Sequence, residues 1–86
     1  MSPRVVLYSG GGCHLCDDVH DVLDEVRREL PFELELRDIA DDPTWFAAYR
    51  HDIPVVTIDG VEAFRHRLTA PALRAALLAA TDRSAR

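Results

Sequence analysis

The sequence contains no lysine, since all ten of its basic residues are arginine, so no lysine side chain can tune the reactivity of a thiol. It has only two cysteines among 86 residues, which excludes a zinc site built from two cysteine pairs. Low-complexity segments and internal repeats are also absent. With 48% hydrophobic and 29% charged residues, the composition is typical of a soluble globular protein and excludes a disordered chain.

Long apolar runs and clustered cations are missing as well. The apolar run at residues 5–8 is shorter than the core of about 7–15 residues that a signal peptide needs, and nothing approaches a membrane span. The formal net charge of −5 argues against a surface that binds nucleic acid phosphates. We therefore expect a cytoplasmic protein with no nucleic acid and no membrane partner, and we expect a monomer.

The chain length allows one domain with a limited core. We expect this domain to span residues 1–81, with a polar tail at 82–86 that frays. The unbroken apolar run at residues 4–8 predicts a central strand covered on both faces. Helical spacing then predicts a helix that Pro31 ends. Its inward stripe is expected to contain Leu15, Val19, Val22, Leu23, Val26 and Leu30.

The sequence from residue 32 onward predicts three more strands, the last two forming a hairpin, and two more helices. Strict alternation at residues 32–38 predicts a strand with one wet face, at the edge of the sheet. Asp42 as the N-cap and Pro43 at the first helical position predict a short helix to about residue 50, whose aromatic residues Trp45, Phe46 and Tyr49 we interpret as core packing.

Residues 53–58 and 61–65 predict two strands joined by a two-residue turn at Asp59-Gly60. Thr69 is expected to cap a last helix, which turns Leu73, Ala76, Leu77 and Ala80 inward. The predicted fold is therefore α/β, with the order β-α-β-α-β-β-α and a four-stranded mixed sheet flanked by helices.

The two cysteines lie three residues apart, in Cys13-His14-Leu15-Cys16, directly after three consecutive glycines. This places both thiols at the start of the first helix, close enough to form a disulfide, and such a spacing near a β-α-β pattern indicates a redox pair. The helical wheel puts Cys16 on the inward stripe and Cys13 in the exposed cap. The helix dipole favours an anion at Cys13, so we expect its pKa to lie below that of an ordinary thiol.

These positions predict a thiol-disulfide exchange reaction. The Cys13 thiolate attacks a substrate disulfide to form a mixed disulfide, and Cys16 then attacks the Cys13 sulfur and releases the reduced product. The oxidised protein must afterwards be recycled by a second thiol or by a reductase. Ile53-Pro54 is a second candidate site, because a proline that opens a strand adds no N–H to the ladder and can carry a cis bond.

Taken together, the strand that ends at Tyr8, the Cys13–Cys16 motif, the Ile53-Pro54-Val55-Val56 stretch and the last helix resemble the thioredoxin superfamily, most of all short bacterial glutaredoxin-like proteins. The resemblance implies that Cys13 is the nucleophile and that Cys16 resolves the mixed disulfide. It also implies that Pro54 is cis and packs beside the cysteines, and that Ile53 pairs with the backbone of glutathione or of a substrate peptide.

The expected catalytic residues are thus Cys13 and Cys16, and the expected substrate-binding residues are Gly12, His14, Ile53, Pro54 and Thr69. Family members often bind the γ-glutamyl group of glutathione at the start of the last helix, where this chain has Thr69 and Pro71. Pro71 removes one donor from that turn and weakens an anion site. We expect no bound cofactor and a disulfide-containing protein or small thiol as substrate, with glutathione, another low-molecular-weight thiol or a thioredoxin reductase for recycling.

Two alternatives remain open at this point. Cys13, Cys16, His20 and His14 offer metal ligands, although a closed zinc site normally draws a second pair from elsewhere. Binding of an iron–sulfur cluster through the cysteines, shared between two chains, belongs to the same alternative. A non-catalytic binding or redox-sensing module on the same fold is the other alternative, because a fold does not fix a function. We interpret His51 and the Arg65-His66-Arg67 run as solvated surface.

Overall fold

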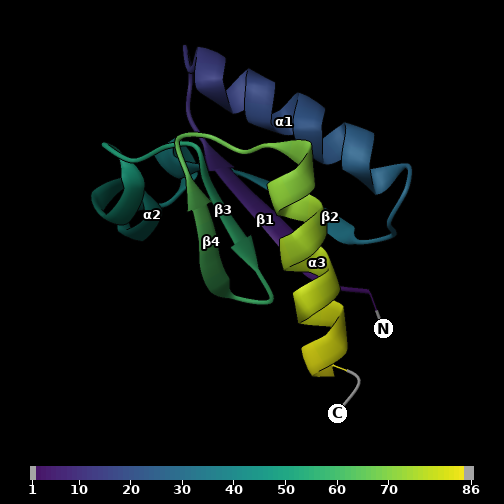
Figure 1. The fold of residues 1–86 in the computed structure, drawn as a ribbon. Helices are drawn as coiled ribbons and strands as arrows, with labels where there is room; N and C mark the ends of the chain where they lie inside the picture. Colours follow the sequence, from purple (N-terminus) through teal and green to yellow (C-terminus); the bar gives the residue numbers. More distant parts are fainter. Residues whose placement is uncertain (1, 85–86) are drawn as a thin grey trace.

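The computed structural model describes residues 2–84 and shows one mixed sheet flanked by helices (Figure 1). This arrangement confirms the predicted order β-α-β-α-β-β-α, with one short 3₁₀ turn added before the second helix. The elements are β1 (Arg4–Ser9), α1 (His14–Arg27), β2 (Glu33–Asp38), η1 (Ile39–Asp41), α2 (Pro43–Tyr49), β3 (Val55–Ile58), β4 (Val61–Arg65) and α3 (Ala70–Ser84).

The strand order in the sheet is β2-β1-β3-β4, with β1 parallel to β2 and antiparallel to β3. The apolar run of β1 is therefore central, as its composition predicts, and the alternating strand β2 lies at an edge. The hairpin turn is also confirmed, because Asp59 and Gly60 both have positive φ, at 52° and 83°, which a type I′ turn requires.

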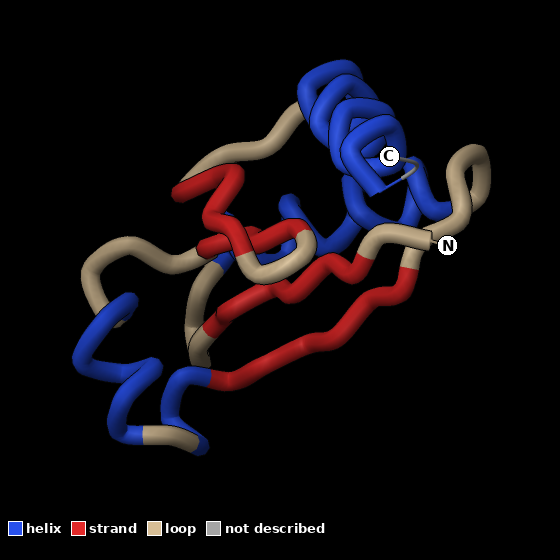
Figure 2. The backbone as a smooth tube through the Cα atoms, turned by 90° about the horizontal axis from the view of Figure 1, so that it is seen from below, coloured by secondary structure: helices blue, strands red, loops and turns tan. Residues whose placement is uncertain are grey.

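Helices α1 and α3 lie on one face of the sheet, and α2 lies on the other (Figure 2). The core consequently has two parts, and successive residues of β1 alternate between them. Val5 and Leu7 join the cluster under α1 and α3, whereas Val6 and Tyr8 join the cluster on the α2 side. This two-sided burial fixes β1, and with it the position of the loop that follows.

The inward faces of the two long helices agree largely with the predicted stripes. In α1 the buried residues are Cys16, Val19, Leu23 and Val26, and in α3 they include Leu73, Leu77 and Ala80. The prediction is wrong for Leu15, which is 43% exposed. Leu15 lies one turn before Val19 on the same side of the helix, so its exposure follows from its place in the first turn of α1 and not from its helical spacing.

The short helix α2 begins as predicted, with the Asp42 carboxylate accepting from the Thr44 N–H at 2.7 Å. Its Trp45 and Tyr49 pack on Tyr8, with ring centroids 5.8 and 4.6 Å away. Phe46, however, is 46% exposed, so the core interpretation is wrong for it. A helix of two turns presents one face to the sheet, and Phe46 does not lie on the face that carries Trp45 and Tyr49.

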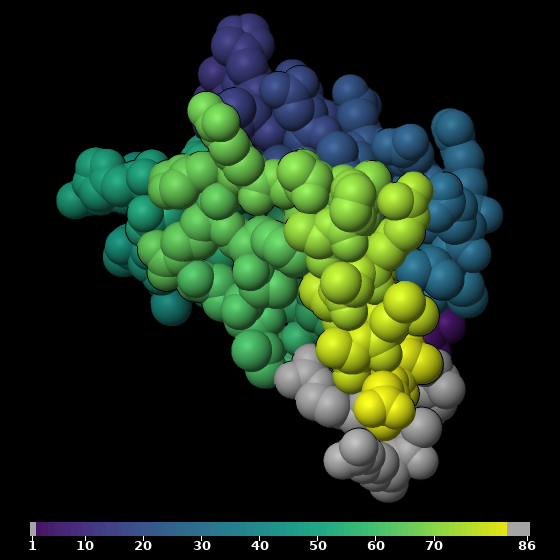
Figure 3. All heavy atoms as spheres, viewed as in Figure 1, coloured from purple at the N-terminus to yellow at the C-terminus, as the bar shows by residue number. Residues whose placement is uncertain are grey.

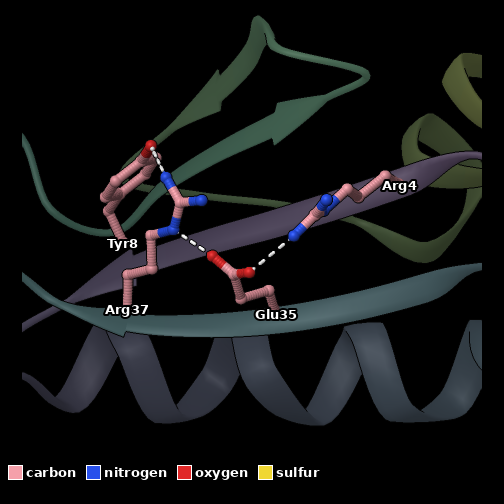
Figure 4. Close-up of polar contacts among 4 residues, drawn as sticks. All are labelled: Arg4, Tyr8, Glu35 and Arg37. Carbon is pink, nitrogen blue, oxygen red and sulfur yellow. Dashed lines mark hydrogen bonds and ion pairs between the residues drawn. The ribbon is translucent and has the colours of Figure 1, made fainter.

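Polar side chains cover part of the sheet face that points away from α1 (Figure 4). Glu35 accepts from Arg4 at 2.7 Å and also pairs with Arg37, and these two hydrogen bonds, that of Arg37 first, lower the pKa of its carboxyl. The Arg37 guanidinium donates to the Tyr8 hydroxyl at 2.8 Å and stacks 4.9 Å from the Trp45 ring centroid. Arg37 therefore packs over the aromatic residues on the α2 side of the sheet.

The carboxyl-terminal end differs from the expectation. Helix α3 continues through Asp82–Ser84, which the sequence placed in a polar tail, and residues 85–86 of that tail lie outside the described residues. The alanine-rich turns before Asp82 favour helix strongly enough to carry these polar residues with them. Within residues 2–84, the helices are too short or too polar to span a bilayer.

Candidate redox site

The loop between β1 and α1 carries the two cysteines at the end of the central strand. Gly12 has φ of +73°, a conformation that a side chain disfavours, and nothing lies within 4 Å of the place where its Cβ would be. Glycine is therefore needed at this position for its backbone conformation and not for space. The turn directs the chain into α1 immediately after Cys13.

Cys13 is the N-cap of α1, as the helical pattern predicts. Its backbone is extended, and its Sγ accepts a hydrogen bond from the Cys16 N–H at 3.1 Å. A sulfur in this position lies at the positive end of the helix dipole, which stabilises a thiolate. Cys13 is half-buried, whereas Cys16 is only 4% exposed. The accessible sulfur and the shielded sulfur are therefore those that the sequence assigns.

The two cysteines are joined by a disulfide, with their Cα atoms 5.3 Å apart. This separation lies within the usual range for a bridge, so the fold can hold the pair in its oxidised form. Figure 3 shows the purple residues at the start of α1 exposed at the upper edge of the molecule. A substrate can thus approach the loop from solvent.

The Ile53-Pro54 peptide bond is cis, as the resemblance implies, and Pro54 is fully buried. Ile53 packs against the glycine loop, because a Cβ placed on Gly10 would lie 2.9 Å from its Cδ1. The Ile53 N–H already donates to the Tyr49 carbonyl at 3.1 Å. A partner backbone that used this N–H would first have to displace that bond, whereas pairing to the Ile53 carbonyl would leave it in place.

A shallow pocket of about 340 Å³ adjoins the glycine loop on the α2 side. Arg50 reaches over the exposed Phe46 ring at this pocket, with its guanidinium carbon 5.9 Å from the ring centroid. Sequence reasoning missed this surface, because it interpreted Phe46 as core and His51 as plain surface. The lining residues are Gly10, Gly11, Asp38, Ile39, Ala40, Phe46, Arg50, His51 and Ile53.

The remaining predicted site residues lie at helix starts. His14 is the first residue of α1 and is exposed. Thr69 caps α3, as predicted, since its hydroxyl accepts from the Ala72 N–H at 3.3 Å. This bond uses one lone pair of the hydroxyl and leaves its O–H free to donate. Ile53, by contrast, lies against Gly10 of the loop that leads to Cys13.

The interpretation of Arg65 and His66 as merely solvated surface is incomplete. Both are partly exposed, but Arg65 forms an ion pair with Asp52 at 2.8 Å, and the His66 N–H donates to the Pro54 carbonyl at 2.8 Å. No sequence pattern links these residues, because they lie on opposite sides of the hairpin.

Among residues 2–84, no three His, Cys, Asp or Glu side chains gather as metal ligands, and His20 faces Asp24 at 3.6 Å.

Residues 4–78 match the family described as Glutaredoxin-like domain (DUF836). The chain belongs to this glutaredoxin-like family. On the thioredoxin-superfamily fold of such a protein, a close pair of cysteines at a helix start indicates a redox function.

Solved structures agree with this assignment. The glutaredoxin-like chain is similar to protein XcR50 from X. campestris, with 33% identity and a TM-score of 0.74 over 87% of this chain and 96% of that chain. Protein Ne2328 from Nitrosomonas europaea has 25% identity and a TM-score of 0.78 over 90% and 93% of the two chains. Thioredoxin 1 from Thermosipho africanus, at 14% identity, TM-score 0.61 and coverage of 91% and 98%, shows the shared thioredoxin fold alone.

Proposed function

We propose that this glutaredoxin-like protein is a dithiol thiol-disulfide oxidoreductase that reduces disulfides of proteins or small molecules. The observation that carries the proposal is the hydrogen bond from the Cys16 N–H to the Cys13 sulfur at the start of α1. It supports a thiolate on the accessible cysteine while the second cysteine stays buried behind it. An exposed nucleophile with a shielded partner is what the two-step exchange needs.

The reaction begins with both cysteines reduced. The Cys13 thiolate attacks one sulfur of the substrate disulfide, forming a mixed disulfide and releasing the other substrate sulfur as a thiolate, which takes up a proton. The Cys16 thiol loses its proton and attacks the Cys13 sulfur, which forms the Cys13–Cys16 bond and releases the second substrate thiol. Two electrons thus pass from the protein to the substrate. One of the two protons comes from the Cys16 thiol and the other from solvent, because Cys13 reacts as a thiolate.

Binding of the substrate uses the surface around Cys13. The substrate backbone pairs with the carbonyl of Ile53, beside the cis Pro54. Gly12 and His14 contact the substrate groups next to the attacked sulfur. Thr69 contributes at the start of α3. Glutathione, another low-molecular-weight thiol or a thioredoxin reductase returns the oxidised protein to its dithiol form, and the protein works as a cytoplasmic monomer.

Turnover tests the proposal directly. The wild-type protein is expected to accelerate the reduction of insulin or hydroxyethyl disulfide with dithiothreitol, glutathione or a thioredoxin reductase as the electron source. Cys13→Ser removes the nucleophile and should abolish turnover, whereas Cys16→Ser should trap a mixed disulfide on Cys13 that mass spectrometry detects. The proposal fails if the wild type shows no turnover with any of the three reductants.

A further inference from the structure

Residues at the end of β4 bind the segment before β3. They contact Asp52 and Pro54, the two neighbours of the predicted substrate-binding residue Ile53. Arg65 Nη1 lies 2.8 Å from Asp52 Oδ2, and the His66 Nε2 lies 3.8 Å from Asp52 Oδ1. The His66 N–H donates to the Pro54 carbonyl at 2.8 Å. We call Asp52, Arg65 and His66 the Asp52 clamp. It holds the chain on both sides of Ile53.

The backbone of His66 adopts an uncommon conformation to make these contacts. Its φ is +66°, in the left-handed region that residues other than glycine seldom occupy. Such a conformation persists only where surrounding contacts stabilise it. A turn hydrogen bond from the Arg67 N–H to the Arg65 carbonyl at 2.7 Å closes around His66, and the bond from the His66 N–H to the Pro54 carbonyl fixes this turn against the segment before β3.

The clamp acts on a segment that is also restrained from the other side. The Ile53 N–H donates to the Tyr49 carbonyl, and the Ile53 side chain lies against Gly10 of the loop that leads to Cys13. The side chain of Asp52 is 32% exposed, so its ion pair is partly shielded from water. A shift of Asp52 would therefore move the Ile53 carbonyl relative to the glycine loop.

We propose that Asp52 is a positioning residue, which through Arg65 and His66 sets the Ile53 carbonyl at the distance from Cys13 that an extended polypeptide substrate requires. This inference rests on the proposed function. It predicts a dependence on substrate size, because a polypeptide reaches Ile53 while its disulfide is at Cys13, whereas hydroxyethyl disulfide is too small to use that contact.

The test compares Asp52→Asn with Glu29→Gln, a matched control that breaks another partly exposed arginine pair, Glu29–Arg74, at the far end of α1. Asp52→Asn should raise the KM for insulin roughly two- to fivefold, the size expected for one partly exposed ion pair. Its KM for hydroxyethyl disulfide and its rate of Cys13 alkylation by iodoacetamide should equal those of the wild type. Asp52→Glu, which keeps the carboxylate, should restore part of the insulin KM.

A double variant identifies the route. Asp52→Asn combined with Arg65→Gln should raise the insulin KM no further than Arg65→Gln alone, because both changes remove the Asp52–Arg65 contact. Arg65→Gln also breaks the pair with Glu62 at 2.6 Å, so Glu62→Gln is measured as the control for that second loss. An unchanged insulin KM in an active Asp52→Asn protein overturns the inference, as does an equal rise for hydroxyethyl disulfide or in Glu29→Gln. A wild-type protein that reduces neither substrate overturns the proposed function instead.

Discussion

At the scale of single residues, Cys13 combines two roles. Its sulfur caps α1 by accepting from the Cys16 N–H, and it is also the proposed nucleophile. The same unpaired N–H groups that make a helix start unstable without a cap favour a negative charge there. The local structure and the proposed chemistry therefore depend on one hydrogen-bond acceptor.

Gly12 gives a residue-scale prediction for the loop that presents Cys13. Gly12→Ala should lower the free energy of unfolding by about 1 kcal/mol, because alanine is disfavoured at a φ of +73°. Gly11→Ala is the matched control, since Gly11 also has open space around it but no positive φ, and it should be neutral within about 0.5 kcal/mol. Urea unfolding of the two variants measures the difference, and equal losses would refute this account of Gly12.

The residues of the candidate site were predictable to different degrees. The spacing of Cys13 and Cys16 identifies both residues and also which of them is buried, because one helical wheel contains them. Asp52 and Arg65 were not predictable as a pair, since their contact exists only once the β3–β4 hairpin has folded. Local patterns thus reveal the thiols, while the contacts around Ile53 depend on tertiary structure.

At the scale of elements, local chemistry predicts the sheet and the helix starts well. The alternation at residues 32–38 and the unbroken run before Ser9 predict an edge and a centre because burial on one or two faces leaves different patterns. The exposure of Leu15 and Phe46 was not predictable from apolar character alone. Whether such side chains are covered depends on what packs beside them, and α2 is too short to bury Phe46.

The cap of α2 gives a prediction at this scale. Asp42→Ala should lower the free energy of unfolding by about 1 kcal/mol, because the Thr44 and Trp45 N–H groups lose their acceptor. Amides of α2 should exchange faster with solvent than in the control Asp41→Ala, which removes a neighbouring charge from the preceding 3₁₀ turn. Hydrogen exchange checks this, and equal protection of α2 in both variants would contradict the capping role.

At the scale of the whole molecule, the packing of α1 against α3 should respond to acid. Hydrogen bonds from Arg74 lower the pKa of Glu29 below its ordinary value of 4.5, and this pair joins the turn after α1 to α3. A lowered pKa means that the folded state binds the proton less readily than the unfolded state does. Stability from this pair is thus present above pH 4.5 and is lost as the pH falls through the lowered value.

The free energy of unfolding should therefore decrease on acidification below about pH 4.5, and it should decrease less steeply in Arg74→Gln. Glu35 and Glu62, whose pKa values arginines also lower, add to the decrease in both proteins. Urea unfolding at several pH values between about 3 and 6 measures the two slopes. Parallel curves would show that the Glu29–Arg74 pair does not couple stability to pH.

The central claim concerns the pair of sulfurs, and a redox titration tests it most directly. The protein is equilibrated with glutathione buffers of graded potential, its remaining thiols are alkylated, and the products are mapped by mass spectrometry. We predict one two-electron transition in which both thiols disappear together as an intramolecular Cys13–Cys16 disulfide. Oxidised protein that carries only separate adducts or links between chains, with no bond between these two sulfurs, would contradict the account.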